Sequence, residues 1–313
     1  MNVDLFVRGS APLDAEVLNS WVGPSEVDLL VAGSIGYTIQ ALQRLGVQVD
    51  VCTTFGEDSF GRFLKTSVEA AGIGTSLSRS AAGETAIAIY MLLFGGSKRP
   101  MTYRLPTFEP WPEPIPVDSM AGLSLLHCGG LLHFPNMWHR DLASVFGRAR
   151  EAGVLTALDP QFPLTDMPAP WLPHFADVMP HVDVFLCDEH ESRSIFGTDD
   201  AEVALKKALS MGPRVAAIKL GERGALAGDR SGTVHQPAVG IPKGLVRESV
   251  GAGDAFDAGF LTALLNGAGA AEAARFATAV AAVTLSGRGG AERIAGPHAV
   301  ESELAKVPAA TRR

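Results

Sequence analysis

The residues best suited to chemistry are Gly251, Ala252, Gly253 and Asp254, which directly precede an apolar stretch ending near Leu265. Two glycines allow the backbone to turn sharply and to approach a ligand closely. The first N–H groups of the following helix lack intrahelical partners, and together with the helix dipole they favour a bound anion. A carboxylate repels such an anion, so Asp254 suggests a second task, which is to take a proton from an attacking hydroxyl.

The same residues also have plainer explanations. Asp is a common helix N-cap and Gly-Ala-Gly a common tight turn, so residue types alone leave the capping interpretation open. A dinucleotide fingerprint G-x-G-x-x-G is excluded, because its third glycine would fall at Phe256. A phosphate-binding loop of the form G-x-x-x-x-G-K-[ST] occurs nowhere in the chain.

Length, composition and charge narrow the classes of function. The 313 residues, 47% of them hydrophobic, can bury a large core as one α/β domain with or without a small appendage. A net charge of −8 and the lack of a basic run argue against a nucleic-acid partner. We expect no membrane span, because glycines, a proline and histidines interrupt the longest uncharged stretch, residues 119–139. We expect no signal peptide either, because the N-terminal residues lack its pattern. Three widely spaced cysteines are typical of buried thiols in a cytoplasmic protein: Cys52, Cys128 and Cys187.

Strands and helices alternate along most of the chain. Apolar residues at helical spacing predict helices at 35–45 and 60–71, with a strand at 47–53 between them. Further strands are predicted at 123–128, 154–159, 182–187 and 215–220. Further helices are predicted at 140–152, 189–196, 201–211, 254–266 and 270–286. This alternation favours a doubly wound α/β fold, with a mostly parallel sheet and helices on both faces.

Three segments do not fit the alternation and predict a small separate β-sheet, which we interpret as a lid. They are residues 5–8, residues 27–31 and a hairpin over 85–105 that turns at Gly95-Gly96. The expected domains are an α/β nucleotide- and substrate-binding core at 32–84 and 106–313, and a lid with a substrate-contacting segment at 1–31 and 85–105.

Six segments, in order along nearly the whole chain, together resemble the ribokinase-like (PfkB) family of carbohydrate kinases. They are NVDL at 2–5, AGSIGYTIQALQRLG at 32–46, TFGEDSFGRFL at 54–64, DEHE at 188–191, KLGERGAL at 219–226 and ESVGAGD at 248–254. The last resembles the family's C-terminal signature D-T-x-G-A-G-D, and DEHE stands in place of its N-x-x-E. Helix capping at Asp254 does not explain the other five matches.

The resemblance implies ATP-dependent phosphorylation of an alcohol on a sugar or a similar small molecule. The amides of Gly251 to Gly253 would hold the charge on the transferring phosphoryl group, and Asp254 would take the proton of the acceptor hydroxyl. Mg²⁺ would neutralise the phosphates of ATP, with Asp188 and Glu191 as the matching positions near it. Charged residues are also common in the first turn of a helix, which leaves a second interpretation of these two open.

The resemblance also implies substrate and nucleotide positions. The sugar-contacting positions match Asp4, Gly33, Ser34 and Tyr37. A carboxylate accepts hydrogen bonds from sugar hydroxyls, and a glycine allows close approach. The positions beside the nucleotide match Asp188, Lys219, Gly221 and Gly224.

Structural interpretations of the same residues stay open. Asp4 also suits a turn, Lys219 a solvated strand end, and Gly221 and Gly224 a hairpin turn. Asp257 lies one helical turn after Asp254, and we interpret it as a supporting or solvated residue.

The chain departs from the family pattern in several places. Tyr37 stands where the family commonly has Asn, and Ala32 replaces the first glycine of a pair, so the substrate is expected to be unusual. Glu248 replaces the Asp of the C-terminal signature, which puts a monovalent-cation site in doubt. The step Asp159-Pro160-Gln161 lacks the arginine that often follows. The family's first strand normally precedes residues 2–5, and losing it would leave neighbouring strands with unpaired edges.

The expected function is therefore an ATP-dependent carbohydrate kinase, acting as a homodimer through its lid. A nucleoside kinase of the same fold is the nearest alternative, since substrate specificity depends on the site and not on the fold. A catalytically weak sugar-binding or regulatory protein is an alternative of another class. The presence of Asp254 with both glycines argues against it.

Overall fold

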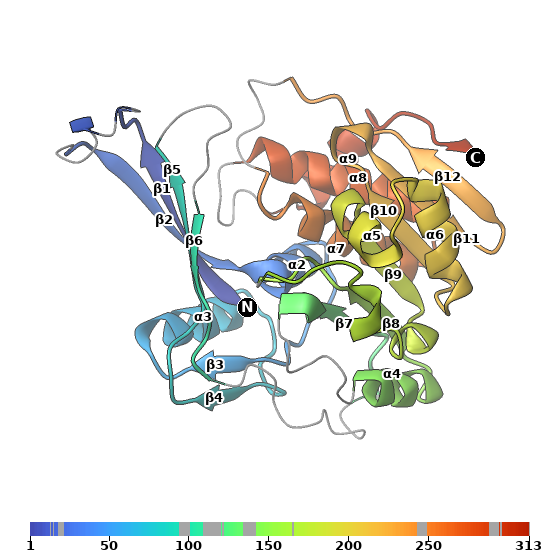
Figure 1. The fold of residues 1–313 in the computed structure, drawn as a ribbon, viewed down its shortest axis with the longest axis horizontal. Helices are drawn as coiled ribbons and strands as arrows, with labels where there is room; N and C mark the ends of the chain where they lie inside the picture. The colour runs from blue at the N-terminus through green and yellow to red at the C-terminus, as the bar shows by residue number, and fades with distance from the viewer. Residues whose placement is uncertain are drawn as a thin grey trace.

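The protein is described by a computed structural model that covers most of the chain. The described residues are 1–12, 14, 16–17, 22–93, 101–108, 120, 122–133, 142–164, 166–242, 249–287, 294 and 296–312. Glu248, the Gly95-Gly96 turn and the start of the helix expected at 140–152 lie outside them. The described elements form a main sheet, a small four-stranded sheet and a two-stranded sheet (Figure 1).

The main sheet has the strand order β13-β12-β11-β10-β9-β8-β7. Its strands are β7 (Leu125–Gly129), β8 (Leu155–Asp159), β9 (Val184–Asp188), β10 (Val215–Lys219), β11 (Ala225–Asp229), β12 (Gly232–Gln236) and β13 (Thr311–Arg312). Strands β7 to β10 are parallel, as expected from their alternation with helices. Strands β11 to β13, which the sequence pattern does not predict, extend the sheet in antiparallel pairs.

Helices cover both faces of this sheet, as the doubly wound prediction requires. Three of them pack on one face: α4 (Leu142–Glu151), α5 (Glu189–Phe196) and α6 (Ala201–Ser210). Four helices belong to the core on the other face of the sheet: α2 (Gly33–Arg44), α3 (Ser59–Ala70), α7 (Ala252–Leu265) and α8 (Ala270–Ser286). The strands alternate accordingly, so that in β9 Phe185 faces the first core and Leu186 the second. A last helix, α9 (Pro297–Leu304), packs against α8.

The small sheet has the order β2-β1-β5-β6 and stands apart from the main sheet at the left of Figure 1. It consists of β1 (Asn2–Gly9), β2 (Ser25–Ala32), β5 (Ile87–Leu92) and β6 (Met101–Arg104). Strands β5 and β6 are antiparallel, as expected for the hairpin. The inner ends of β1 and β2 lie against the start of α2. This contact places residues of the small sheet beside the main domain.

The strand expected at residues 47–53 is wrong. Asp50 makes one isolated bridge with Gly74, and the two-stranded sheet forms further on, from β3 (Thr54–Gly56) and β4 (Arg79–Ala81). A strand needs a partner for its ladder, and the described chain supplies none for residues 47–53 beyond that bridge. A cavity of about 620 Å³ is lined instead by residues 47–54 and by all of β7, the edge strand of the main sheet.

Candidate active site

The site is built around the N-terminus of α7. Gly251 is the N-cap residue and has a left-handed backbone, with φ of 78°, which glycine adopts without strain. The Ala252 N–H donates to the Ser249 carbonyl at 3.2 Å, so it already has a partner. Within the described residues no backbone carbonyl accepts from the N–H groups of Gly253 or Asp254. These two amides are therefore the donors that α7 offers to an anion.

Asp254 lies in the first turn of α7 and is 8% exposed. Its Oδ1 accepts a hydrogen bond of 2.9 Å from Nε2 of Gln161, in the turn after β8. Burial raises the pKa of Asp254 to about 6, while the nearby Lys219 ammonium and the Gln161 hydrogen bond act against that rise. The Ser34 hydroxyl, in the first turn of α2, also lowers this pKa, although its geometry falls short of a hydrogen bond. A carboxyl with this pKa exchanges a proton readily near neutral pH.

A buried ion network lies beneath this helix start. Lys219, at the end of β10, donates from Nζ to Asp159 Oδ2 at 2.8 Å and to both oxygens of Asp257 at 3.1 Å. The side chains of Lys219, Asp159 and Asp257 are 13%, 0% and 1% exposed. Burial lowers the pKa of Lys219, but the Asp159 and Asp257 carboxylates outweigh it and hold that pKa well above its usual value. The ammonium therefore stays charged.

The network corrects two expectations. Lys219 is not a solvated strand end, because its ammonium is bound to two buried carboxylates. Asp257 is not solvated, because it is one of those partners. A methyl group at Gly253 would lie 3.7 Å from Lys219 Nζ, so the ammonium lies next to the first turn of α7. There it offsets the negative charge of Asp159 and Asp257, which would otherwise oppose an anion held by the amides of α7.

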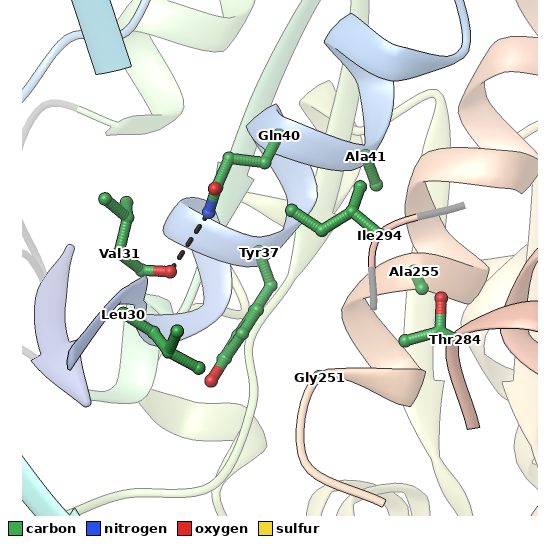
Figure 2. Close-up of a pocket in the computed structure, with 9 residues that line it drawn as sticks. All are labelled: Leu30, Val31, Tyr37, Gln40, Ala41, Gly251, Ala255, Thr284 and Ile294. Carbon is green, nitrogen blue, oxygen red and sulfur yellow. Dashed lines mark hydrogen bonds between the residues drawn. The ribbon is translucent and has the colours of Figure 1, made fainter. Parts of the chain in front are cut away.

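Asp4, in β1, is 2% exposed and faces α2 and not a surface turn. Its Oδ2 accepts from the Tyr37 hydroxyl at 2.7 Å, and its Oδ1 accepts from the Asn2 amide at 2.7 Å. Figure 2 shows Tyr37 projecting from α2 between Leu30 and Gly251. A methyl group at Gly251 would come within 3.0 Å of the Tyr37 ring. Tyr37 therefore bridges the small sheet and the start of α7.

Gly33 and Ser34 complete this side of the site. Gly33 opens α2 with φ of 77°, and a side chain there would overlap the Asn2 amide oxygen. Ser34 is 8% exposed and lies in the same turn. The structure thus brings three of the expected sugar-side residues, Asp4, Ser34 and Tyr37, to the base of the small sheet, near α7.

Asp188 and Glu191 form a capping box at the start of α5. Asp188 Oδ1 accepts from the Glu191 N–H at 2.7 Å, and Glu191 Oε2 accepts from the Asp188 N–H at 2.6 Å. Burial raises the pKa of Glu191 well above its usual value, and Asp159 and Asp188 add to the rise. In the part of the chain that the structure describes, no group of three or more His, Cys, Asp or Glu side chains is arranged to hold a metal ion. A role of these two residues near Mg²⁺ stays a prediction.

With this geometry in place, comparison with known proteins decides the family. Residues 25–295 match the family model described as pfkB family carbohydrate kinase. The chain belongs to the pfkB family. It is an ATP-dependent carbohydrate kinase by that membership, in agreement with the expectation from its motifs.

Relatives of this pfkB kinase include the 2-dehydro-3-deoxygluconokinase of Thermoproteus tenax, which is 27% identical over 88% of this chain and 85% of that protein. Among solved structures, Arabidopsis thaliana ribokinase with ribose and ATP has a TM-score of 0.74, with 22% identity over 97% of this chain and 96% of that one. A putative ribokinase II of E. coli with ATP and Mg²⁺ has a TM-score of 0.77, with 17% identity over 97% and 96% of the two chains. The fold is therefore ribokinase-like.

Three further features of the pfkB kinase bear on the expectations. Gly221 and Gly224 bound the short turn between β10 and β11, and both have positive φ, which agrees with a hairpin turn. Their place beside the nucleotide stays a prediction.

Cys52 is only half-buried, whereas Cys128 and Cys187 are buried, and all three are free thiols. None of the described helices is both long and apolar enough to span a membrane.

Gln161 and Asn2 both contact expected site residues, although neither was itself expected in the site. Asn2 stands in the segment NVDL that carries the resemblance, so its position two residues before Asp4 was a usable signal. Gln161 lies 93 residues before Asp254, and nothing in the local sequence connects the two.

Gly251→Ala is expected to destabilise the pfkB kinase more than a matched glycine does. Gly267 has a similar φ, 85°, but open space around it, so Gly267→Ala measures backbone strain alone, about 1 kcal/mol. Gly251→Ala adds the overlap with Tyr37, which costs about 1–3 kcal/mol more. Urea denaturation of both variants gives the two free energies of unfolding. Equal losses would show that Tyr37 moves aside freely.

Proposed function

We propose that this pfkB kinase transfers the γ-phosphoryl group of ATP to a hydroxyl of a sugar or sugar-like small molecule. One observation carries the proposal: a buried carboxyl, Asp254, with a pKa of about 6, stands in the first turn of a helix whose free amides suit an anion. A base and an anion site side by side are what the transfer to an alcohol needs.

The anion side of the reaction is assigned to α7 and Lys219. The amides of Gly253 and Asp254 hold the negative charge of the transferring phosphoryl oxygens, and the Lys219 ammonium next to Gly253 offsets the negative charge of the neighbouring carboxylates. Asp254 orients the acceptor hydroxyl and receives its proton. Phosphoryl transfer depends more on positioning and charge neutralisation than on a strong base, so a carboxyl of this pKa is sufficient.

Mg²⁺, when bound, neutralises the phosphates of ATP. Asp188 and Glu191 fit a supporting role because each uses one carboxylate oxygen for the capping box and keeps a second oxygen for a metal-bound water. Such an indirect role agrees with the absence, among the described residues, of a complete set of metal-ligating side chains. The departure at Glu248 gives no support to a monovalent-cation site.

The acceptor side is assigned to the base of the small sheet. The Asp4 carboxylate accepts hydrogen bonds from the Asn2 amide and the Tyr37 hydroxyl, and we assign a substrate hydroxyl to the same carboxylate, because one carboxylate oxygen can accept more than one hydrogen bond. Ser34 lies beside Asp254, and the Tyr37 ring beside Gly251 limits the size of an acceptor bound there. The small sheet then acts as a lid that excludes water, which would otherwise hydrolyse ATP.

A homodimer through the small sheet is part of the proposal. Val27, Leu29 and Met101, on the two outer strands β2 and β6, are between 37% and 57% exposed. Pairing of two small sheets would cover these apolar side chains and the outer edges of β2 and β6. Sedimentation velocity measures the association state directly.

An acceptor panel tests the function. Purified protein with ATP and Mg²⁺ is expected to release ADP only when a suitable acceptor is added from a set of pentoses, hexoses, sugar acids and nucleosides. Turnover with a nucleoside alone would indicate a nucleoside kinase. A sugar that raises the melting temperature without any turnover would instead indicate a binding or regulatory protein.

A further inference from the structure

Gln161 has a backbone conformation that its residue type rarely adopts. Its φ is 56°, and among the described residues it is the one non-glycine residue with a positive φ. It follows Asp159 and Pro160 at the end of β8, at the carboxyl edge of the parallel strands. A strained residue at this edge needs a compensating reason.

Three hydrogen bonds hold the turn in this shape. The Gln161 N–H donates to Asp159 Oδ1 at 3.1 Å. The Asp159 carbonyl accepts from the Gly130 N–H at 2.8 Å, and the Pro160 carbonyl accepts from the Leu132 N–H at 2.9 Å. Asp159 itself is fixed through its other oxygen by Lys219. The turn is thus anchored both to the neighbouring turn after β7 and to the buried ion network.

The strained turn directs the Gln161 side chain at Asp254. Nε2 lies 2.9 Å from Asp254 Oδ1, and because an ionised carboxylate only accepts hydrogen bonds, the amide nitrogen is the group that faces it. The bond fixes one of the two carboxylate oxygens and leaves the other for the acceptor hydroxyl. Gln161 is half-buried, and the bond to Asp254 is the side-chain hydrogen bond that the described residues give it.

We propose that Gln161 is a positioning residue for Asp254: its amide holds the carboxylate ionised and in one orientation, with Oδ2 free to receive the proton. The inference rests on the proposed function of Asp254 as the base. It adds a residue to that function which does not contact the reacting atoms itself.

The charges around Asp254 make this contact important. Lys219 on β10 favours the ionised carboxylate, whereas Asp159 on β8 and Asp257 on α7 oppose it. From α2 the group facing it is the uncharged Ser34, and the charged residues of α8, Glu272 and Arg275, are exposed. Because these charges act on Asp254 in opposite directions, the loss of one hydrogen bond to its carboxylate is expected to shift its pKa measurably.

The test compares Gln161→Gly with the wild-type protein. Glycine adopts the left-handed turn without strain, so the variant deletes the amide and is expected to keep or raise the melting temperature at pH 4, where Asp254 is protonated in the folded protein. The midpoint of the Asp254 carboxyl titration, followed by ¹³C NMR and assigned by its absence in Asp254→Asn, is expected to rise by about one pH unit. Gln161→Leu, which keeps the bulk without the donor, is expected to give the same rise. Gln48→Gly, at an exposed glutamine, is the control and should leave the midpoint unchanged.

The titration needs no substrate, so it is informative even if the acceptor panel shows no turnover. Where turnover is measured, the pH below which it falls is expected to rise by the same amount as the midpoint of the Asp254 titration. Turnover at pH 8 should fall about tenfold, because the carboxylate loses its fixed orientation. An unchanged midpoint in a folded Gln161→Gly or Gln161→Leu protein overturns the inference. So does a lower melting temperature with an unchanged midpoint, which would assign Gln161 to the turn alone.

Discussion

Asp254→Asn is expected to lower turnover by about 10³-fold, because the amide has the shape of the carboxyl but cannot take a proton from the acceptor. ATP binding, measured by calorimetry, should change little, since the amides of Gly253 and residue 254 are kept. Asp177→Asn, at an exposed carboxylate, is the control and should keep full turnover. Turnover of Asp254→Asn within tenfold of the wild type would remove Asp254 from the role of base.

Turnover and stability are both expected to depend on pH through the ionisation of Asp254. The base acts only when ionised, so wild-type turnover should fall as the pH drops through about 6, the pKa of Asp254.

Because burial raises the pKa of Asp254 above its value in the unfolded chain, the ionised carboxyl destabilises the folded protein above pH 6. Asp254→Asn should therefore raise the free energy of unfolding at pH 8, by about 1–3 kcal/mol, and give little gain at pH 4.

Lys219→Met is expected to lower the free energy of unfolding by about 3–5 kcal/mol, because it leaves Asp159 and Asp257 buried without their cation. The loss should shrink at pH 5, where an unpaired carboxyl takes up a proton more readily. Urea denaturation at both pH values measures it. Lys306→Met breaks an exposed ion pair with Glu303 and should cost less than about 1 kcal/mol. Losses of equal size in the two variants would contradict a strong network at Lys219.

The features that the sequence predicted well are those encoded locally. Helices α5 and α8 begin and end at the expected residues, since apolar spacing and capping residues are read within a few positions. The sharp turn at Gly251 was also visible, because glycines directly before an apolar helix favour such a turn. The prediction of a strand at 47–53 was wrong because a strand is not encoded locally: it depends on a partner elsewhere in the chain.

The site residues that the sequence could not place are joined by long-range contacts. Lys219 is 60 residues from Asp159 and 38 from Asp257, so its charge gave no sign of being buried between them. Gln161 carries no reactive group, and a left-handed backbone at a glutamine has no sequence signal. Tyr37 was singled out as a departure from the family, but its bond to Asp4 required the fold.

The burial of α7 between α2 and α8 has a consequence for heating. Nearly every residue from Asp254 to Ala263 is buried, so the amides of this helix are expected to exchange with deuterium only when the whole domain unfolds. The outer strands β2 and β6 are more exposed, so their amides are expected to exchange through local opening. The small sheet and α7 are thus expected to open at different temperatures. As the proposed lid, the small sheet is expected to lose its closed form, and the kinase its protection from water, below the melting temperature of the core.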